Sequence, residues 1–345
     1  MTLTMRDIAK KANVSIATVS RVLNNSGYVK QETRQAVEKI IEKYSYTPNA
    51  LARSLSKNDM RTVGYVTPDV SEVYFNAVFK GASATALEND VNMLVCDTNN
   101  NEEREMKALR MLKEYRVNGA IITPTISTID KHNDYLRMLE NMGIPVVLVD
   151  IDVKNSMFDG VFVDNISGAF DATNAFIKCG HKKIAIITGP MSVKGGKDRF
   201  EGYAQALAAN GLELDKRFIF YGDFTRASGY RMAQRIFEMP AEERPSAVLT
   251  CNNQMTLGCM RYLAENGLRI GRDISLISYD DIELFEYCHM GLSAVDSATF
   301  EMGRNAIEIV MQRMEECRRG VEKSRIQRVI LIPKLILRGS EKLIR

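Results

Sequence analysis

The chain has 345 residues, of which 45% are hydrophobic and 26% charged, a composition typical of a soluble globular protein. This length is more than one hydrophobic core usually organises, so two or three domains are expected. No segment approaches the roughly 20 consecutive apolar residues that span a bilayer, and the first residues do not form an apolar signal segment. We therefore expect a cytoplasmic protein that does not contact a membrane.

Cysteine and histidine residues give no pattern of a metal or redox site. The six cysteines form no C-x-x-C pair, and several lie in apolar runs, as buried thiols do in a reducing compartment. The three histidines, His132, His181 and His289, are far apart and have no ligand spacing. The sequence thus predicts neither a metal nor a cofactor.

Positive charge is concentrated in the first 60 residues. This segment holds ten Lys or Arg and five Asp or Glu, an excess of five, although the whole chain has a net charge of only +3. The remainder is therefore slightly acidic. A basic end on an acidic body indicates that a polyanion binds at that end.

Apolar spacing in this basic segment predicts three short helices, in the runs "TMRDIAKKAN", "SIATVSRVL" and "KQETRQAVEKIIEKYSY". Thr4 and Ser15 are plausible N-caps of the first two. In the second helix, Val19 and Val22 have core spacing, whereas the opposite face carries a single charge, on Arg21. An ordinary solvated face would more often be filled with Lys and Glu.

Two helices joined by a tight turn, the second with a lightly charged outer face, are typical of a helix-turn-helix. Such a helix fits the major groove of DNA, where the planar guanidinium of Arg21 suits the paired acceptors of guanine. An ordinary three-helix subdomain with a solvated second helix is the alternative on periodicity alone.

The next run, "YTPNALARSLSKNDMR", predicts a helix of about eight residues that begins near Pro48 and ends in a polar linker. A helix this short is marginal alone, and we expect it to form only with a stabilising partner, such as a twin helix and DNA. Leu55 would then insert between base steps in the minor groove. A linker helix packed on the body is the alternative.

The run from "MRDIAKKANVSIATVSRVLNN" to "YTPNALARSL" resembles the DNA-binding head of the lactose-repressor (LacI/GalR) transcription factors. The resemblance implies that Ile16, Ala17 and Arg21 read bases and that Leu55 is the minor-groove wedge of a hinge helix. It also implies phosphate or positioning contacts for Thr4, Ser15, Thr18, Ser20, Asn24 and Thr33. Asn49 and Ala52 of the predicted hinge segment are further DNA-binding candidates.

From Thr62 onward, short apolar runs alternate with amphipathic stretches, which predicts parallel sheets with helices on both faces. Two such series, separated near Asp159, predict two similar lobes. The predicted helices lie near residues 74–89, 102–115, 132–142, 167–179, 199–210, 227–238 and 254–266.

Ligands of such open sheets bind beyond the carboxyl ends of the strands. The residues that follow the predicted strands are rich in Asp, Asn and Arg, with aromatic residues nearby: Asp69 to Phe75, Asp97, Thr123–Thr125, Asp150, the Gly189–Arg199 loop, Asn252–Asn253 and Asp280–Asp281. This mixture suits a small polyhydroxylated or planar ligand. Asp and Asn also favour helix caps and turns, which is the alternative for each position.

The runs "GPMSVKGGKDRFEGY", "TCNNQMTLGCM" and "ISLISYDD" resemble the effector domain of the same family, which has a periplasmic-binding-protein-like fold. The match implies that Arg199, Asn252 and Asp280 hold the effector and that Asp150 lies near it. Aromatic or pocket-wall positions match Tyr74, Phe75 and Phe224, and Thr123 is a further candidate from its strand end.

One departure concerns Asn253, which stands where the family commonly has Asp, and it argues against a charge-dependent role there. The Tyr74–Phe75 pair is shared with purine-binding relatives, whereas Arg199, Asn252 and Asp280 are compatible with sugars. The effector therefore stays open among sugars, sugar phosphates and purines.

The expected architecture is α/β. It has a helix-turn-helix head in residues 1–47, a hinge helix and linker in 48–61, and an effector-binding and dimerisation domain in 62–345. That domain consists of two lobes of doubly wound parallel sheet, with a break near 160 and crossovers near 290 and 322.

Enzyme motifs are absent from the sequence. "GPMSVKGGKD" lacks the spacing and the Ser or Thr of a phosphate-binding loop, and no G-x-G-x-x-G, G-x-S-x-G or H-E-x-x-H run occurs. A solute-binding protein would need export and would have no use for a basic head. We expect a transcriptional repressor that binds a pseudo-palindromic operator as a homodimer and controls a carbohydrate-utilisation operon. A repressor that responds to a purine or another metabolite is the alternative.

Overall fold

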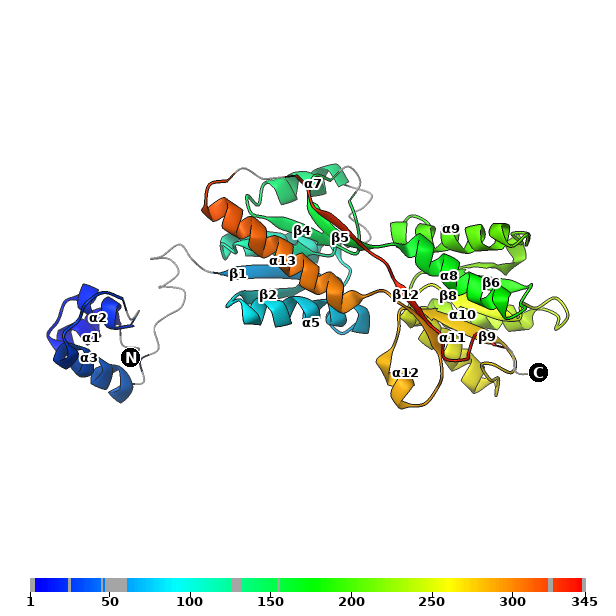
Figure 1. Cartoon of the computed structure of the whole chain (residues 1–345), viewed down its shortest axis with the longest axis horizontal. Helices are drawn as coiled ribbons and strands as arrows, with labels where there is room; N and C mark the ends of the chain where they lie inside the picture. Colours follow the sequence, from blue (N-terminus) through cyan, green and yellow to red (C-terminus); the bar gives the residue numbers. More distant parts are fainter. Residues whose placement is uncertain are drawn as a thin grey trace. The chain divides into compact units, whose positions relative to one another are not determined.

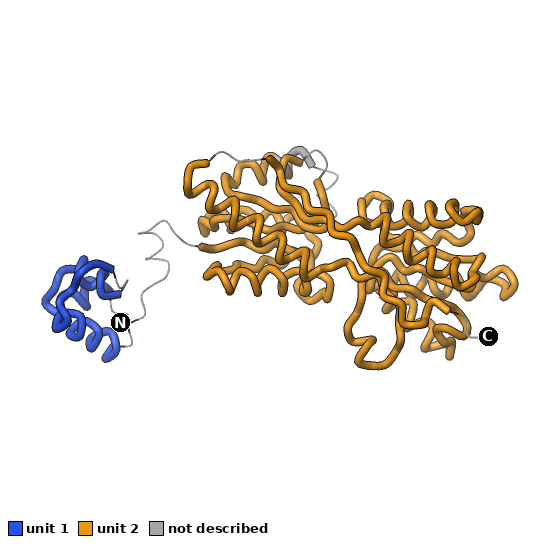
Figure 2. Tube along the Cα trace, viewed as in Figure 1, with its two compact units in different colours: residues 1–60 blue, residues 61–345 orange. Residues whose placement is uncertain are grey.

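The computed structural model describes residues 4–23, 26–44, 46, 61–125, 132–153, 156–321 and 325–342 (Figure 1). The chain divides into two compact units, Met1–Met60 and Arg61–Arg345, which we call the N-terminal unit and the larger unit (Figure 2). Each unit has its own hydrophobic core.

The N-terminal unit contains three helices, α1 (Met5–Ala12), α2 (Ile16–Leu23) and α3 (Gln31–Lys43). Helix α1 begins with a capping box, in which the Asp7 backbone N–H donates to Thr4 Oγ1 (3.3 Å) and the Thr4 N–H to Asp7 Oδ2 (2.9 Å). Helix α2 begins after Ser15, whose Oγ accepts from the Thr18 N–H at 3.1 Å. The small core contains Ile8, Ala9, Val19, Val22 and Val37.

The larger unit consists of two lobes, each built on a six-stranded sheet. Lobe 1 has the strand order β11-β5-β4-β3-β1-β2, and every pair is parallel. Its strands are β1 (Thr62–Thr67), β2 (Asn92–Asp97), β3 (Gly119–Ile122), β4 (Val146–Val149), β5 (Asp159–Val163) and β11 (Arg328–Leu331). Its helices are α5 (Val73–Glu88), α6 (Glu102–Glu114), α7 (His132–Glu140) and α13 (Thr299–Arg318).

Lobe 2 repeats the plan with the order β12-β10-β9-β8-β6-β7. Its strands are β6 (Ile184–Thr188), β7 (Ile219–Tyr221), β8 (Ala247–Thr250), β9 (Ser275–Tyr279), β10 (Ser293–Asp296) and β12 (Lys334–Ile336). Only β12 deviates from the parallel arrangement, because it pairs antiparallel with β10 at the sheet edge. The helices are α8 (Asn165–Lys178), α9 (Lys194–Ala209), α10 (Arg226–Glu238), α11 (Asn253–Glu265) and α12 (Glu283–Tyr287), with a 3₁₀ turn at Lys216–Phe218.

The central strands are apolar without alternation because helices cover both faces of each sheet. In lobe 1, Ile121 packs in the cluster with α5 and α13, whereas the next residue, Ile122, packs with α6 on the opposite face. This arrangement confirms the predicted α/β class of doubly wound parallel sheets. Of the helices in the described part of the chain, none has both the length and the apolar character needed to cross a bilayer.

The chain passes from one lobe to the other at three places in the described residues (Figure 1). The first crossing follows β5, at Asp164, close to the expected break near 160. The others lie between β10 and α13, at 297–298, and between β11 and β12, at 332–333, rather than near 290 and 322. Both are later than expected because β10 still belongs to the lobe 2 sheet and β11 to the lobe 1 sheet.

Helix α13 is absent from the helices predicted from the sequence, yet it packs extensively on α5. Two glycines permit the close approach of the two helices. A Cβ at Gly81 would lie 1.9 Å from the Phe300 carbonyl oxygen, and one at Gly303 would lie 1.8 Å from that of Val78. The two backbones therefore meet where no side chain fits.

Replacing Gly303 with alanine should destabilise the larger unit, because the added methyl group must push two backbones apart. We expect Gly303→Ala to lower the free energy of unfolding by about 1–3 kcal/mol, measured by urea denaturation followed by circular dichroism. Gly195→Ala is the control, since its Cβ would have its nearest neighbour, Asn165 Nδ2, at 4.0 Å. Equal stability of the two variants would contradict this account of the helix contact.

Candidate functional site

The exposed face of α2 carries the predicted base-reading residues. Ile16, Ala17 and Arg21 are exposed, whereas Val19 and Val22 are buried on the opposite side. Ile16 is 43% exposed, so part of its apolar side chain is open to contact from outside the described helices. The exposed face of α2 therefore carries the planar guanidinium of Arg21, a hydrogen-bond donor, and the apolar side chains of Ile16 and Ala17.

The other predicted DNA-binding residues differ in their settings. Thr4 and Ser15 lie at the N-termini of α1 and α2, where backbone N–H groups favour an anion. Thr18, Ser20 and Thr33 are partly buried. The predictions for Asn24, Asn49, Ala52 and Leu55 lie outside the described residues.

A cavity of about 420 Å³ lies between the two lobes of the larger unit, and both lobes contribute to its walls. Seven of the eight predicted effector residues line it: Tyr74, Phe75, Asp150, Arg199, Phe224, Asn252 and Asp280. Thr123 does not. It is fully buried, and its backbone N–H donates to the Val66 carbonyl at 2.9 Å, which places it against β1 rather than at the cavity.

The floor of the cavity in lobe 2 is built around the buried guanidinium of Arg199. This residue lies inside α9, which begins at Lys194 and thus earlier than the helix predicted near 199–210. Its Nε donates to Asn165 Oδ1 (2.8 Å), and its Nη1 donates to the Cys251 carbonyl. The guanidinium also lies 3.9 Å from the centre of the Tyr279 ring. One cation thus connects α8, α9 and the ends of β8 and β9.

Asp280 follows β9 and faces the same guanidinium, with 4.0 Å between Arg199 Nη1 and Asp280 Oδ2. Its Oδ1 accepts a hydrogen bond from Ser297 Oγ at 2.7 Å. Burial raises the pKa of Asp280 to about 6, although Arg199 and Ser297 act in the opposite direction. The Asp280 carboxyl group therefore changes its protonation state at a pH only slightly below neutral.

Lobe 1 supplies a phenol, a carboxylate and an aromatic ring to the opposite wall. Tyr74 donates from its hydroxyl to Asp150 Oδ1 at 2.7 Å, and its ring meets that of Phe75 edge to face, with 5.3 Å between centroids. Burial raises the pKa of Asp150, and its hydrogen bond from Tyr74 and the charge of Arg199 partly counteract this. This wall presents both acceptors and an apolar surface to the cavity.

Five cavity residues that follow strands have left-handed backbones. The φ angles are 47° at Asn99, 53° at Asn100, 65° at Asp150, 65° at Phe224 and 69° at Asp280. Residues with a side chain adopt this region at a cost, and such strain clusters at functional sites. The turn re-aims the side chains of Asp150 and Asp280 immediately after their strands end, and that of Phe224 shortly after β7.

Asn252 fulfils both of the alternatives considered for it, as a helix cap and as a cavity residue. Its Oδ1 accepts from the Met255 N–H at the start of α11 (2.9 Å), and its Nδ2 donates to the Phe224 carbonyl (3.0 Å). Asn252 thus fixes the turn that carries Phe224.

Several further residues line the cavity. Asp223, Arg226 and Gln254 were not singled out from the sequence, whereas Glu72, Lys194 and Asn253 lie in the predicted strand-end segments but were not among the predicted effector residues. Most follow a strand or begin a helix, so the same strand-end signal extends to them. Together with Asp69, Asp150, Asp280 and Arg199, they give five carboxylates and three cations. No group of three or more potential metal ligands occurs in the part of the chain that the structure describes.

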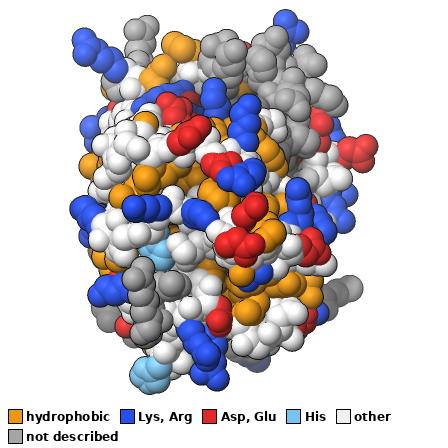
Figure 3. Space-filling view, turned by 90° about the vertical axis from the view of Figure 1, so that its right-hand side faces the viewer, with side chains coloured by type: hydrophobic (Ala, Val, Ile, Leu, Met, Phe, Trp, Pro, Cys, Tyr) orange, Lys and Arg blue, Asp and Glu red, His pale blue; other side chains and the backbone are white. Residues whose placement is uncertain are grey.

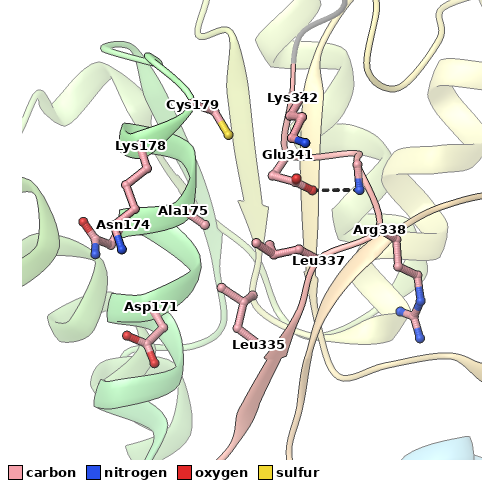
Figure 4. Close-up of a pocket in the computed structure, with 11 residues that line it drawn as sticks. Asp171, Asn174, Ala175, Lys178, Cys179, Leu335, Leu337, Arg338, Glu341 and Lys342 are labelled. Atoms are coloured by element: carbon pink, nitrogen blue, oxygen red, sulfur yellow. Dashed lines mark hydrogen bonds between the residues drawn. The ribbon is translucent and has the colours of Figure 1, made fainter.

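A second hollow, of about 640 Å³, lies on the outside of lobe 2 between α8 and the C-terminal segment (Figure 4). Asp171, Asn174 and Lys178 project from the helix, while Leu335 lies on the facing strand β12 and Leu337 just beyond its end. Although it is larger, this hollow involves one lobe only, so a ligand there would not contact both lobes. The face of the molecule in Figure 3 mixes basic, acidic and apolar side chains without one dominant charge.

The comparisons with known proteins agree with both units. The family of bacterial regulatory proteins described as lacI matches residues 4–49, and the periplasmic binding protein-like domain matches residues 173–341. The transcriptional repressor PurR of Haemophilus influenzae (strain PittEE) is 32% identical over 340 residues, 98% of each chain. The repressor CytR of Escherichia coli K12 is 30% identical over 312 residues, 90% of each chain.

Solved structures show the same fold over almost the entire chain. The complex of the transcriptional regulator CelR with cellobiose has a TM-score of 0.70 at 27% identity, and covers 98% of this chain and 99% of that one. A Lac repressor dimer bound to operator and an anti-inducer has a TM-score of 0.83 at 23% identity, with coverage of 99% and 100%.

These findings define a regulatory protein with a helix-turn-helix head and a two-lobed periplasmic-binding-like domain. The chain belongs to the lacI family of bacterial regulatory proteins and is a DNA-binding transcriptional regulator. This confirms the family and the function class expected from the sequence.

The raised pKa of Asp280 predicts a specific dependence of stability on pH. Because its folded pKa, about 6, exceeds the ordinary 3.8, the protonated folded form is favoured, and that stabilisation is lost as pH rises through 6. Relative to Asp280→Asn, the wild type should lose roughly 2–3 kcal/mol of unfolding free energy between pH 4 and pH 7. Urea denaturation of both proteins across this range gives the measurement, and parallel pH curves would contradict it.

Proposed function

We propose that the protein is a ligand-controlled repressor that binds a pseudo-palindromic operator as a homodimer and releases or engages it when a small effector enters the cavity between the lobes. The cavity carries this proposal, because its walls come from both lobes in a member of a regulatory family. Neither a metal nor a cofactor has a role in this mechanism. The protein acts in the cytoplasm, where it reaches the chromosome.

The N-terminal unit recognises the operator. The exposed face of α2 enters the major groove, where Ile16, Ala17 and Arg21 contact base edges. Thr4, Ser15, Thr18, Ser20 and Thr33 position the unit on the phosphates, together with Asn24. Two such units in one dimer meet successive major grooves, and paired hinge helices bring Asn49, Ala52 and Leu55 to the minor groove between them.

A neutral polyhydroxylated effector, a sugar, suits the cavity best. Carboxylates outnumber cations on its walls by five to three, and the guanidinium of Arg199 is already engaged by Asn165, Cys251 and Asp280. Both features disfavour a phosphate group. Carboxylates accept hydrogen bonds from the hydroxyls of a sugar, and side-chain amides both accept and donate them. Phe75 and Phe224 cover an apolar face of the ligand. The 27% identical CelR, solved with cellobiose, supports a carbohydrate.

A planar heterocycle such as a purine is the second candidate, favoured by the edge-to-face pair of Tyr74 and Phe75. In either case the effector contacts both lobes and favours one lobe arrangement. The free energy that couples effector and operator binding should be about 1–3 kcal/mol and the same in both directions.

Arg21→Ala tests the base-reading role of α2. The variant should lose about 1–3 kcal/mol of discrimination at one operator position while its preference at the other positions is kept. Competition gel shifts with operator variants at fixed salt measure this loss. Arg110→Ala, which removes an exposed arginine of α6, is the matched control and should leave the preference unchanged. An equal loss of affinity on all sequences would instead make Arg21 a phosphate contact.

Ligand screening tests the cavity. Sugars, sugar phosphates and purines are added to the purified protein, and the matching effector should raise the melting temperature, with roughly 2.7 kcal/mol of stabilisation at a hundred times its Kd. Asp280→Ala should lose this shift and still bind operator without effector. Asp171→Ala, in the hollow outside lobe 2, is the control and should respond like the wild type. A response that Asp171→Ala loses and Asp280→Ala keeps would move the effector site to that hollow.

A further inference from the structure

Glu72 of lobe 1 makes two hydrogen bonds across the cavity to lobe 2. Its Oε1 accepts from Asn253 Nδ2 at 2.8 Å and from Gln254 Nε2 at 3.0 Å, both in the first turn of α11. Its Oε2 accepts from the Tyr74 N–H at 3.1 Å and thereby caps α5. One carboxylate thus joins the N-termini of two helices that belong to different lobes.

The partners are arranged so that this carboxylate meets donors only. Gln254 Oε1 accepts from Arg226 Nε at 2.6 Å, which turns the NH₂ group of Gln254 toward Glu72. Asn253 is 2% exposed, so its amide has little access to water in place of Glu72. A hydrogen bond to a charged acceptor is stronger than one between neutral groups, and more so where water is scarce.

The identity of residue 253 matters for this contact. An aspartate at this position would set a second carboxylate opposite Glu72 and would have no hydrogen to donate at neutral pH. The amide of Asn253 and the carboxylate of Glu72 therefore form a complementary pair. Glu72 also faces the other acids of the cavity, since its charge contributes to the raised pKa of Asp280.

We propose that Glu72 is a positioning residue that latches lobe 1 to the N-terminus of α11 through the side-chain amides of Asn253 and Gln254. The cavity coexists with these hydrogen bonds, so a small ligand enters beside the latch and need not break it. The latch thus stabilises the lobe arrangement that the effector uses. This consequence for effector affinity rests on the proposed function, whereas the latch itself does not.

The separation of the lobes can be measured with the protein's own thiols. In the full-length chain, Cys179 of lobe 2, Cys288 of lobe 2 and Cys317 of lobe 1 are exposed, whereas Cys96, Cys251 and Cys259 are buried. Cys288→Ser leaves one reactive thiol on each lobe for a spin label. Double electron–electron resonance, with labelled protein diluted into unlabelled protein, then reports the distance between lobes within one chain.

Asn253→Asp should lengthen and broaden this distance distribution, because two carboxylates repel where one hydrogen bond stood. Adding Glu72→Gln should reverse part of this change. The new glutamine accepts from the Tyr74 N–H with its oxygen and donates from its nitrogen to the introduced carboxylate, but the same nitrogen replaces the acceptor of Gln254 Nε2. Asn266→Asp, at the far end of the same helix, is the control for added charge and should leave the distribution unchanged.

An unchanged distribution in Asn253→Asp, or a double variant whose distribution equals that of Asn253→Asp, would overturn the latch. If Asn253→Asp does not fold, Glu72→Ala replaces it, and it should likewise lengthen the distance. For the effector identified by screening, we expect Glu72→Ala to raise the dissociation constant about tenfold, as loss of bonds to a charged acceptor would. Because the distance measurement uses neither DNA nor effector, its failure leaves the proposed repressor function intact.

Discussion

The cavity of the larger unit depends on one buried positive charge. Arg199 is 6% exposed, and a guanidinium so far from water is tolerated only when its donors are bonded and its charge is compensated. Asn165, the Cys251 carbonyl, the Tyr279 ring and Asp280 meet these needs together. Because the four come from α8 and the ends of β8 and β9, satisfying Arg199 also fixes how those elements converge. The polar floor is therefore in place before any ligand arrives.

Much of this arrangement follows from rules that a sequence displays. Short apolar runs that alternate with amphipathic stretches predict the two lobes, and the strand-end rule brings Asp150, Asn252 and Asp280 to one cavity. The rule is wrong for Thr123, because it locates the end of a strand but not the direction of each side chain there. The Thr123 N–H pairs with the Val66 carbonyl, and the residue is buried in the lobe.

Other features depend on contacts between segments far apart in the chain. Helix α13 packs on α5 only because Gly81 and Gly303 meet partner backbones, and neither glycine alone indicates a partner. The role of Glu72 is hidden in the same way. In the sequence, Glu72 resembles an ordinary residue at the start of a helix. The two side chains that donate hydrogen bonds to it, Asn253 and Gln254, lie about 180 residues later. The left-handed turns at Asp150, Phe224 and Asp280 occur without glycine and so leave no local signal.

These contacts determine how the cavity can influence the rest of the unit. The two lobes are joined by three crossing segments and, in the cavity itself, by Glu72. The crossings set which chain segments link the lobes, and the second of them also contacts the cavity lining, because Ser297 donates a hydrogen bond to Asp280. Glu72 contacts the first turn of α11, whose N-cap Asn252 holds the turn of Phe224, while Tyr74 connects Glu72 to Asp150. A ligand that displaces or strengthens any member of this chain therefore changes the relative free energies of the lobe arrangements. A ligand bound outside lobe 2 contacts none of these groups and has no such means of acting on both lobes.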